Sequence, residues 1–295
     1  MGTTQAGIEL KMKNILYLTD FSEPSEEALP VAVAIARSYG ATVHALHILT
    51  PAIPASCPEA IKADDELAEI EMQKVESQLA GVDHDTRVAP TMEVWPAIEQ
   101  AIAKQNIDLI VLGTHGRTGA QKLLMGSVAE EIFRRSSVPV LTIGPDVRPG
   151  TCGPRFQRVL FATNFKTHSL SAASYALSLA HENQSRLVLL HVMGKRQAGE
   201  AADDSRFEMS VAEAIHQLYE TVPKSAEMGI SPEVAVEFGE PAERIIEAAR
   251  ERGADLIVMG VHDAAGHIGA ATHLERAVAH KVVAHAPCPV LTVRG

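Results

Sequence analysis

Three spaced glycines and a serine follow a short apolar run, in an order that suits anion binding. The pattern is Gly113-x2-Gly116-x9-Gly126-Ser127, placed after the apolar run 108–112 and before the helical pattern 128–135. Glycines let the backbone approach a phosphate, and the N–H groups of a helix's first turn point towards it. The spacing therefore predicts an anion site between a strand and a helix. It is not a Walker A loop, because no Gly-Lys-Ser or Gly-Lys-Thr run is present.

Polar side chains around this loop are candidates to complete the site. Ser127 is predicted to cap the following helix, and Glu130 three residues on completes a capping-box pattern. Arg117 and Lys122 inside the loop are candidates to offset phosphate charge. Asp20 follows a predicted strand, and we interpret it either as a site residue or as a turn aspartate.

The order of these motifs occurs twice along the 295 residues, which indicates a domain duplication. Residues 14–21 match residues 158–165 at an offset of 144 (158 − 14), and the offset grows to 150 before the last strand (288 − 138). A linker rich in glycine and proline separates the halves. We predict an N-terminal domain over 11–146 and a C-terminal domain over 154–295.

Each half alternates short apolar runs with amphipathic stretches. In the first half we expect strands near 14–19, 42–48, 86–94, 108–113 and 138–143. We expect helices near 25–39, 60–80, 96–105 and 127–136, and in the second half near 169–181, 207–228, 241–252 and 274–285. Gly40 is predicted to end the first helix, and Pro30 to kink or shorten it. Alternating strands and helices predict a parallel sheet whose ligands bind beyond the carboxyl ends of its strands.

The overall composition excludes several classes of function. A net charge of −11 argues against a nucleic-acid partner, which requires a basic surface. No apolar stretch reaches the roughly 18–20 residues that span a bilayer, so we expect no membrane partner. The chain start carries no secretory signal pattern, and the three cysteines are widely separated. These features predict a cytoplasmic location.

The glycine pattern is accompanied by Thr19-Asp20-Phe21-Ser22 after the first strand and by Pro-Val-Leu at the last strand. This combination resembles the universal stress protein family. The resemblance covers both halves, so the chain is similar to a tandem member. It implies an α/β fold of two repeated open parallel-sheet domains with helices on both faces, of the Rossmann-like, adenine-nucleotide α-hydrolase-like type. It also implies a stress-response regulator with ATP and Mg²⁺ as cofactors.

The resemblance also implies which residues hold the nucleotide. In nucleotide-binding members the loop after the fourth strand wraps the triphosphate. The positions that match the ribose and phosphate contacts are Gly113, Gly116, Gly126, Ser127 and Val128. Asp20 matches a position near the adenosine, and Ile48 and Leu112 match apolar positions that pack beside it.

The second half departs from the pattern at the positions that matter most. The replacements are Asn164 for Asp20, Asp263 for Gly116, and Arg276-Ala277 for Gly126-Ser127. The intervening loop is longer, at 16 residues (276 − 260) against 13 (126 − 113). Added Cβ atoms block close backbone approach, and Asp263 repels phosphate, although the Arg276 side chain offers an alternative contact. The sequence therefore predicts one nucleotide per chain, in the N-terminal domain.

No catalytic constellation stands beside the glycine loop, so we expect binding with at most slow ATP hydrolysis. Two alternatives stay open: an enzyme that hydrolyses or transfers from ATP, and a nucleotide-free structural interaction protein. The implied partners are an adenine nucleotide and an unidentified regulatory protein. Tandem members resemble internal pseudo-dimers, here with 138–143 and 290–293 as pairing edges, and a homodimer is a further option.

Histidines are treated as structural or surface residues. His47 and His191 repeat within apolar second strands, and we expect buried, hydrogen-bonded side chains at both. Five further histidines lie between 262 and 285 without a recognised metal-ligand spacing. We interpret those five as scattered surface residues, with a zinc site as the alternative.

Overall fold

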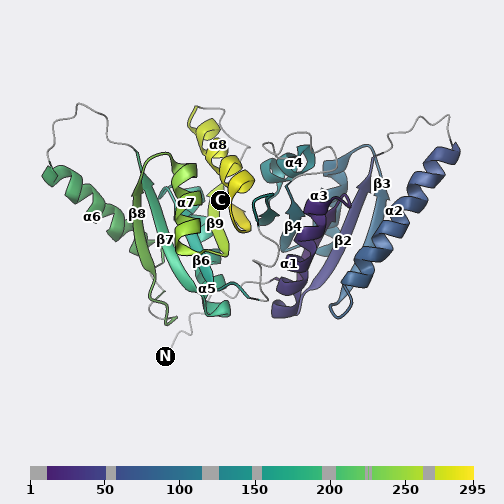
Figure 1. Ribbon diagram of the computed structural model, residues 1–295, viewed down its shortest axis with the longest axis horizontal. Coiled ribbons are helices and arrows are strands. Elements are labelled where there is room, and N and C mark those ends of the chain that lie inside the picture. The colour runs from purple at the N-terminus through teal and green to yellow at the C-terminus, as the bar shows by residue number, and fades with distance from the viewer. Residues whose placement is uncertain are drawn as a thin grey trace. The chain divides into compact units, whose positions relative to one another are not determined.

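The computed structural model describes residues 12–50, 58–114, 126–147, 155–194, 204–222, 225, 228–261 and 270–295. Over these residues the chain forms two compact units, which comprise mainly Met12–Pro145 and Phe156–Gly295. In each unit five strands alternate with four helices, as the duplication predicts (Figure 1).

The N-terminal unit is an open parallel sheet. Its elements are β1 (Asn14–Thr19), α1 (Glu23–Tyr39), β2 (Thr42–Leu49), α2 (Pro58–Gln78), β3 (His84–Pro90), α3 (Val94–Gln105), β4 (Leu109–Gly113), α4 (Ser127–Arg135) and β5 (Val140–Ile143). The strand order is β3-β2-β1-β4-β5, and every neighbouring pair is parallel. The order changes direction at β1 and β4, which is the place where such sheets bind ligands.

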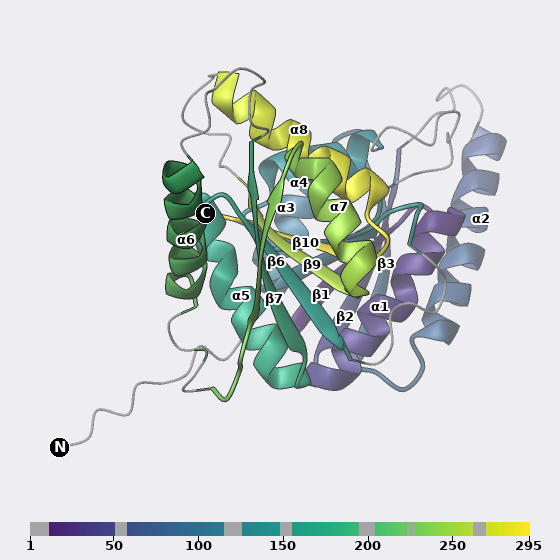
Figure 2. The ribbon, with the colours of Figure 1, turned by 60° about the vertical axis from the view of Figure 1, so that its left-hand side comes forward.

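The C-terminal unit repeats this plan. Its elements are β6 (Arg158–Thr163), α5 (Thr167–Asn183), β7 (Arg186–Met193), α6 (Asp204–Glu220), β8 (Glu233–Phe238), α7 (Pro241–Arg252), β9 (Leu256–Val261), α8 (Ala270–His285) and β10 (Val290–Arg294). The strand order is β8-β7-β6-β9-β10, again with parallel neighbours. Figure 2 shows α5 and α6 on one face of these strands and α7 and α8 on the other. The predicted fold class is confirmed for both units.

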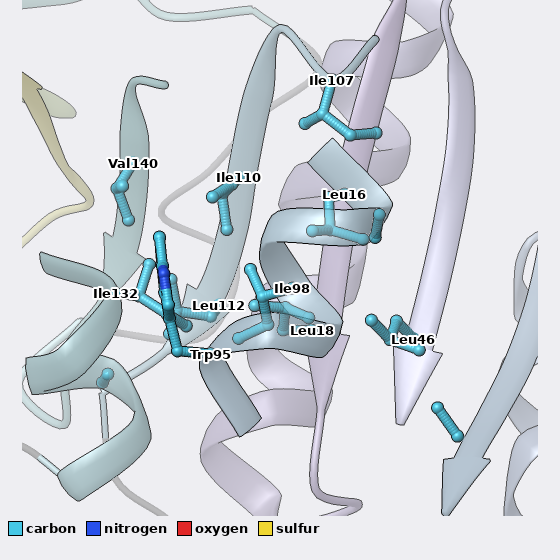
Figure 3. Close-up of a cluster of buried hydrophobic side chains, with 13 residues drawn as sticks. Leu16, Leu18, Leu46, Trp95, Ile98, Ile107, Ile110, Leu112, Ile132 and Val140 are labelled. Atoms are coloured by element: carbon cyan, nitrogen blue, oxygen red, sulfur yellow. The ribbon is translucent and has the colours of Figure 1, made fainter. Parts of the chain in front are cut away.

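Alternate side chains of β1 face opposite layers, as expected for a strand covered on both sides. Leu16 and Leu18 join a buried cluster with Trp95 and Ile98 of α3, together with residues of β4 and α4 (Figure 3). Tyr17 points to the α1 side, where its hydroxyl donates to the backbone carbonyl of Ser25 at 2.7 Å. Burial raises the pKa of Tyr17 to about 12. The strand that carries the candidate site is therefore anchored on both faces.

Three predicted boundaries are wrong by four residues or more. Helix α8 begins at Ala270 rather than near residue 274, and prolines explain the other two. The third strand ends at Pro90 rather than near residue 94, because α3 begins at Val94. Pro96 favours this early helix start, since the missing N–H of a proline costs nothing in the first turn of a helix. Helix α6 ends at Glu220 rather than near residue 228. Pro223 follows three residues later in the sequence, and a proline disfavours helical backbone in the residue before it.

Helix α1 ends as predicted but is not shortened. Gly40 adopts φ 58° and its N–H donates to the carbonyl of Ala36, which closes the helix. Pro30 lies inside the helix, which continues to Tyr39. Pro30 itself is exposed, while Leu29 and Val31 on either side are buried. We attribute the uninterrupted helix to this packing, which offsets the hydrogen bond that proline removes.

Candidate functional site

The predicted site residues that the structure describes lie at one edge of the N-terminal sheet. In the parallel register, Thr19 of β1 pairs with His47 of β2, and Leu18 of β1 pairs with Leu112 of β4. Asp20, Ile48 and Gly113 each follow one of these paired residues in the sequence. The carboxyl ends of β1, β2 and β4 therefore bring these residues to a common edge.

A network of short hydrogen bonds shapes the turn after β1. Thr19 Oγ1 accepts the N–H of Phe21 at 3.0 Å and lies 3.1 Å from Ser25 Oγ. Phe21 adopts φ 57°, a left-handed conformation that non-glycine residues rarely occupy. Asp20, which is half-buried, accepts both the N–H of Ser22 at 3.1 Å and its hydroxyl at 2.5 Å through Oδ1. The turn-aspartate interpretation of Asp20 is confirmed, and its ligand role stays a prediction.

His47 supports the same turn from the neighbouring strand. Its Nδ1 lies 2.8 Å from the carbonyl oxygen of Thr19, to which the ring N–H donates. Its ring packs against Phe21 with centroids 4.2 Å apart, and His191 packs against Phe165 in the other unit at 4.3 Å. The prediction of hydrogen-bonded structural histidines is confirmed for His47, which is 7% exposed. His191 makes the equivalent carbonyl contact at 2.9 Å but is only partly buried.

The first glycine of the motif has a packing role in both units. A Cβ added at Gly113 would lie well under 3.0 Å from the carbonyl oxygen of Pro24, in the first turn of α1. A Cβ added at Gly260 would meet the carbonyl oxygen of His168 in the first turn of α5 in the same way. Because real Cβ atoms essentially never approach so closely, glycine is required here by helix–strand contact. This requirement holds whether or not a ligand binds.

Backbone hydrogen bonds close the base of the glycine loop. Thr114, which is 1% exposed, donates its N–H to the carbonyl of Ile143 at 3.0 Å. Its own carbonyl accepts the N–H of Gly126 at 2.8 Å. The segment between them therefore leaves and returns at one point on the sheet edge. Gly116, Arg117 and Lys122 belong to this segment and lie outside the described residues.

The N-cap residue of helix α4 lies one position before the predicted cap, Ser127. Gly126, rather than Ser127, is the N-cap residue: it has φ −59° and ψ 151°, and its carbonyl accepts the N–H of Glu130 at 2.8 Å. Glycine is a favourable N-cap because it carries no side chain that must be accommodated. Because the N–H of Gly126 already donates to the carbonyl of Thr114, the first N–H groups available to a ligand are those of Ser127 and Val128. The first-turn N–H groups of a helix have no acceptor within the helix.

Apolar residues form a floor beneath the edge. Leu112 is 4% exposed within the buried cluster that packs against α3 and α4. Ile48 is partly buried and packs against the same cluster. Val128, in the first turn of α4, is 40% exposed. The edge therefore combines backbone donors with an apolar base, as small-molecule sites usually do.

The C-terminal unit keeps the turn but changes the helix start. Lys166 donates its N–H to Asn164 Oδ1 at 3.1 Å, so Asn164 takes the place of Asp20 in the turn. Arg276 and Ala277, which align with Gly126 and Ser127, lie inside α8, which already begins at Ala270. Interior N–H groups of an α-helix donate to carbonyls four residues before them. The N–H groups at the start of α4 are therefore available to a ligand, whereas those at the aligned positions of α8 donate within the helix.

Within the described residues, neither a metal centre nor a membrane-spanning helix is present. No group of three or more His, Cys, Asp or Glu side chains within the described ranges is arranged to hold a metal ion. Of the helices that the structure describes, none is long and apolar enough to cross a bilayer. Asp263 lies outside these ranges, and the side chains of Arg276 and Ala277 are likewise not described.

A parallel sheet of this strand order, with helices in the connections between its strands, defines each unit as a Rossmann-like α/β domain. The family model of universal stress proteins matches residues 11–144 and again residues 155–294. The chain therefore belongs to the universal stress protein family, as a tandem two-domain member.

Known relatives agree with this assignment. Universal stress protein MJ0531 of Methanocaldococcus jannaschii is 31% identical over 140 residues, which cover 44% of this chain and 81% of that protein. Universal stress protein Mb2028c of Mycobacterium bovis is 25% identical over 233 residues, covering 75% of this chain and 74% of that protein. A solved universal stress protein from Archaeoglobus fulgidus shares the fold at 24% identity and TM-score 0.67, covering 96% of this chain and 99% of that one.

Proposed function

We propose that the chain binds one adenine nucleotide, ATP with Mg²⁺, at the carboxyl edge of the N-terminal unit. The observation that carries this proposal is the contrast between two helix starts. Helix α4 begins directly after the closed loop, with Gly126 as N-cap, whereas α8 begins at Ala270, seven residues before the position aligned with Ser127 (277 − 270). Only the N-terminal unit thus offers first-turn donors at the position the family motif requires.

Each predicted residue has a defined part in this proposal. The N–H groups of Ser127 and Val128 receive phosphate oxygens at the positive end of α4. Gly116 admits the phosphates and Arg117 offsets their charge. Asp20 would face the ribose side, because it matches a position that lies near the adenosine in nucleotide-binding family members. Ile48 and Leu112 match the apolar positions beside it and would pack there.

Mg²⁺ fits this arrangement as a companion of the nucleotide. It is usually bound through substrate phosphates, retained water molecules and one or two carboxylates. Asp20 is the carboxylate of the turn after β1 at the same edge. When bound, the ion neutralises phosphate charge, while the chain's own groups orient the nucleotide.

The biological role we propose is regulatory rather than catalytic. Nucleotide occupancy in the cytoplasm would bias one conformation of the chain, and a partner protein would read that conformation. Such coupling requires only that the nucleotide binds the two conformations with different affinity. Phosphate release well above background, lost on replacing Asp20 or Ser127, would instead establish an ATP-hydrolysing enzyme.

Isothermal titration calorimetry with ATP and Mg²⁺ tests the proposal, with an expected stoichiometry of one per chain. Mass spectrometry of the denatured protein is a second measurement, because a co-purified nucleotide would mask the heat. A stoichiometry of two, or the absence of both heat and co-purified nucleotide, would overturn the proposal.

A proline at the first position of α4 tests the backbone donor itself. Ser127→Pro removes one N–H at a position where proline is well tolerated, and the preceding Gly126 already has an extended conformation. We expect at least a roughly tenfold loss of ATP affinity, the size of a hydrogen bond to a charged group. Ser127→Ala controls for the hydroxyl. Val94→Pro is the matched control at the first residue of α3, because α7 begins naturally with Pro241.

A further inference from the structure

Ser22 occupies the N-cap position of α1 without capping the helix. Its backbone has the extended conformation of a cap residue, with φ −84° and ψ 156°, yet its side chain makes no cap hydrogen bond. An N-cap serine ordinarily accepts an N–H from the second or third helical residue. Here the hydroxyl donates instead to Asp20 Oδ1 at 2.5 Å.

Two donors of Ser22 converge on one carboxylate oxygen. Its N–H donates to Asp20 Oδ1 at 3.1 Å, alongside the hydroxyl. Ser22 is 8% exposed, so this contact lies beneath the surface of the turn. Charge-assisted hydrogen bonds of this kind are stronger than neutral ones and fix the orientation of the acceptor.

The main chain of the turn is held by other groups. Thr19 Oγ1 accepts the N–H of Phe21 at 3.0 Å, and the carbonyl of Ser22 accepts the N–H of Glu26 at 2.9 Å. The Ser22 hydroxyl adds to these a contact with a side chain rather than with the backbone. Its effect is therefore on the direction of the Asp20 carboxylate.

The C-terminal unit shows that the fold does not require this hydroxyl. Lys166 is the N-cap residue of α5 and likewise makes no side-chain cap bond. Its N–H still donates to Asn164 Oδ1 at 3.1 Å, and α5 spans 17 residues, as α1 does. Serine and aspartate thus change together to lysine and asparagine, while the helix start is retained.

We propose that Ser22 is a positioning residue, which holds the Asp20 carboxylate in the orientation that receives the ribose side of the bound nucleotide. The inference rests on the proposed nucleotide-binding function. Without the hydroxyl, the carboxylate samples further side-chain rotamers, and binding must restrict it again. Ser22 itself need not touch the ligand.

A double-mutant cycle in the full chain separates positioning from a structural role. The affinity for ATP with Mg²⁺ is measured for wild type, Ser22→Ala, Asp20→Ala and the double variant. We expect Ser22→Ala to weaken binding roughly three- to tenfold. In the Asp20→Ala background the same change should have no effect, because the oriented group is gone. Lys166→Ala, at the same cap position in the other unit, should leave affinity unchanged.

The outcomes distinguish this inference from the proposed function. If wild type binds no nucleotide, both fail. If wild type binds and Asp20→Ala weakens binding while Ser22→Ala does not, the function stands and the positioning role is overturned. Equal losses from Ser22→Ala in both backgrounds, or no loss from Asp20→Ala, would also overturn it. As a companion result, we expect Ser22→Ala to lower the free energy of unfolding by no more than about 1 kcal/mol, the size of one lost hydrogen bond, because the C-terminal unit forms the same helix start with lysine there.

Discussion

The N- and C-terminal units share one set of turn contacts and differ in another. The shared contacts maintain the fold, and the contacts that differ lie at the candidate site. The shared residues tie the turn after the first strand of each unit to its neighbours. The pairs are Thr19/Thr163, Phe21/Phe165, Ser25/Ser169, His47/His191 and Gly113/Gly260. The same contacts occur in both units, so we assign them to the fold rather than to a ligand.

The residues that differ lie where the proposed nucleotide would bind. Asp20 and Ser22 become Asn164 and Lys166, which changes the formal charge of the turn from negative to positive. The helix after the fourth strand begins at different places, directly after Gly126 in one unit and at Ala270 in the other. A preserved scaffold with altered chemistry is what we expect if, as proposed, only one copy of the duplicated domain binds the nucleotide.

The largest effect should come from filling the shared glycine positions. Gly113→Ala and Gly260→Ala would each place a Cβ well under 3.0 Å from a backbone carbonyl oxygen of the adjacent helix. Backbone atoms cannot rotate away as a side chain can, so we expect each change to lower the free energy of unfolding of its unit by about 2–3 kcal/mol. Urea unfolding measured by circular dichroism would detect both losses.

The single tryptophan makes this comparison specific to one unit. Trp95 is the only tryptophan of the chain and is buried in the N-terminal unit. Its fluorescence should report early unfolding for Gly113→Ala, while Gly260→Ala should shift the circular dichroism transition without an equal shift in fluorescence. If Gly113→Ala lowers nucleotide affinity but leaves stability intact, the packing role that we assign to this glycine is wrong.

A second difference between the units concerns a buried hydroxyl. Tyr17 aligns with Phe161 at the offset of 144 (161 − 17), and both side chains are fully buried. Burial raises the pKa of Tyr17 to about 12. Above pH 10 the unfolded chain releases the phenolic proton while the folded unit keeps it. The free energy of unfolding should therefore fall by about 1 kcal/mol per pH unit between pH 10 and 12.

Tyr17→Phe introduces the residue found at the aligned position 161 and removes the pH dependence of stability that the phenol causes. At pH 7 we expect it to cost about 1 kcal/mol, because the carbonyl of Ser25 loses its donor. Between pH 9 and 11, urea midpoints from Trp95 fluorescence should decline less steeply for the variant than for wild type. Parallel declines would show that Tyr17 ionises as readily in the folded unit as in the unfolded chain.

The fold was predictable because periodic signals repeat in two copies. Short apolar runs and capped helices such as α1, which ends at Gly40, depend on local contacts that a single sequence reveals. Boundaries near Pro90 and Glu220 were predicted less well, because the competition between neighbouring elements and prolines is decided within a few residues.

The candidate site was predictable in its location but not in its details. Motif order places Asp20 and Gly113 at the same edge, yet spacing alone cannot show that Gly113 packs against Pro24. It also does not show that Gly126, rather than Ser127, takes the cap position, where its carbonyl accepts the N–H of Glu130 and its own N–H donates to Thr114. Nor does spacing show that the hydroxyl of Ser22, at the N-cap position of α1, binds Asp20 instead of capping the helix. Each difference arises from contacts between segments that are not periodic.

The smallest effect concerns an aspartate that joins two strands in each unit. Asp255 accepts the N–H groups of Gln157 and Arg158 at 2.6 and 2.9 Å, one on each carboxylate oxygen. Asp108 accepts the N–H groups of Lys13 and Asn14 at 2.8 and 3.0 Å, both on Oδ2. Asp255→Asn keeps one acceptor oxygen, so we expect a loss of about 1 kcal/mol or less at pH 7. Asp108→Asn should cost less than Asp255→Asn, because one amide oxygen can still accept both N–H groups there.

The pH dependence of this contact sharpens the test. Burial raises the pKa of Asp255 despite the opposing backbone hydrogen bonds. A carboxyl group with a raised pKa holds its proton more tightly in the folded state, so its contribution to stability is complete below the ordinary pKa of aspartate and is lost as pH rises through the raised value. In urea unfolding from pH 3.5 upwards, the free energy of unfolding of wild type should therefore fall relative to that of Asp255→Asn as the pH rises. An identical pH profile for both proteins would mean that Asp255 is as well solvated in the folded unit as in the unfolded chain.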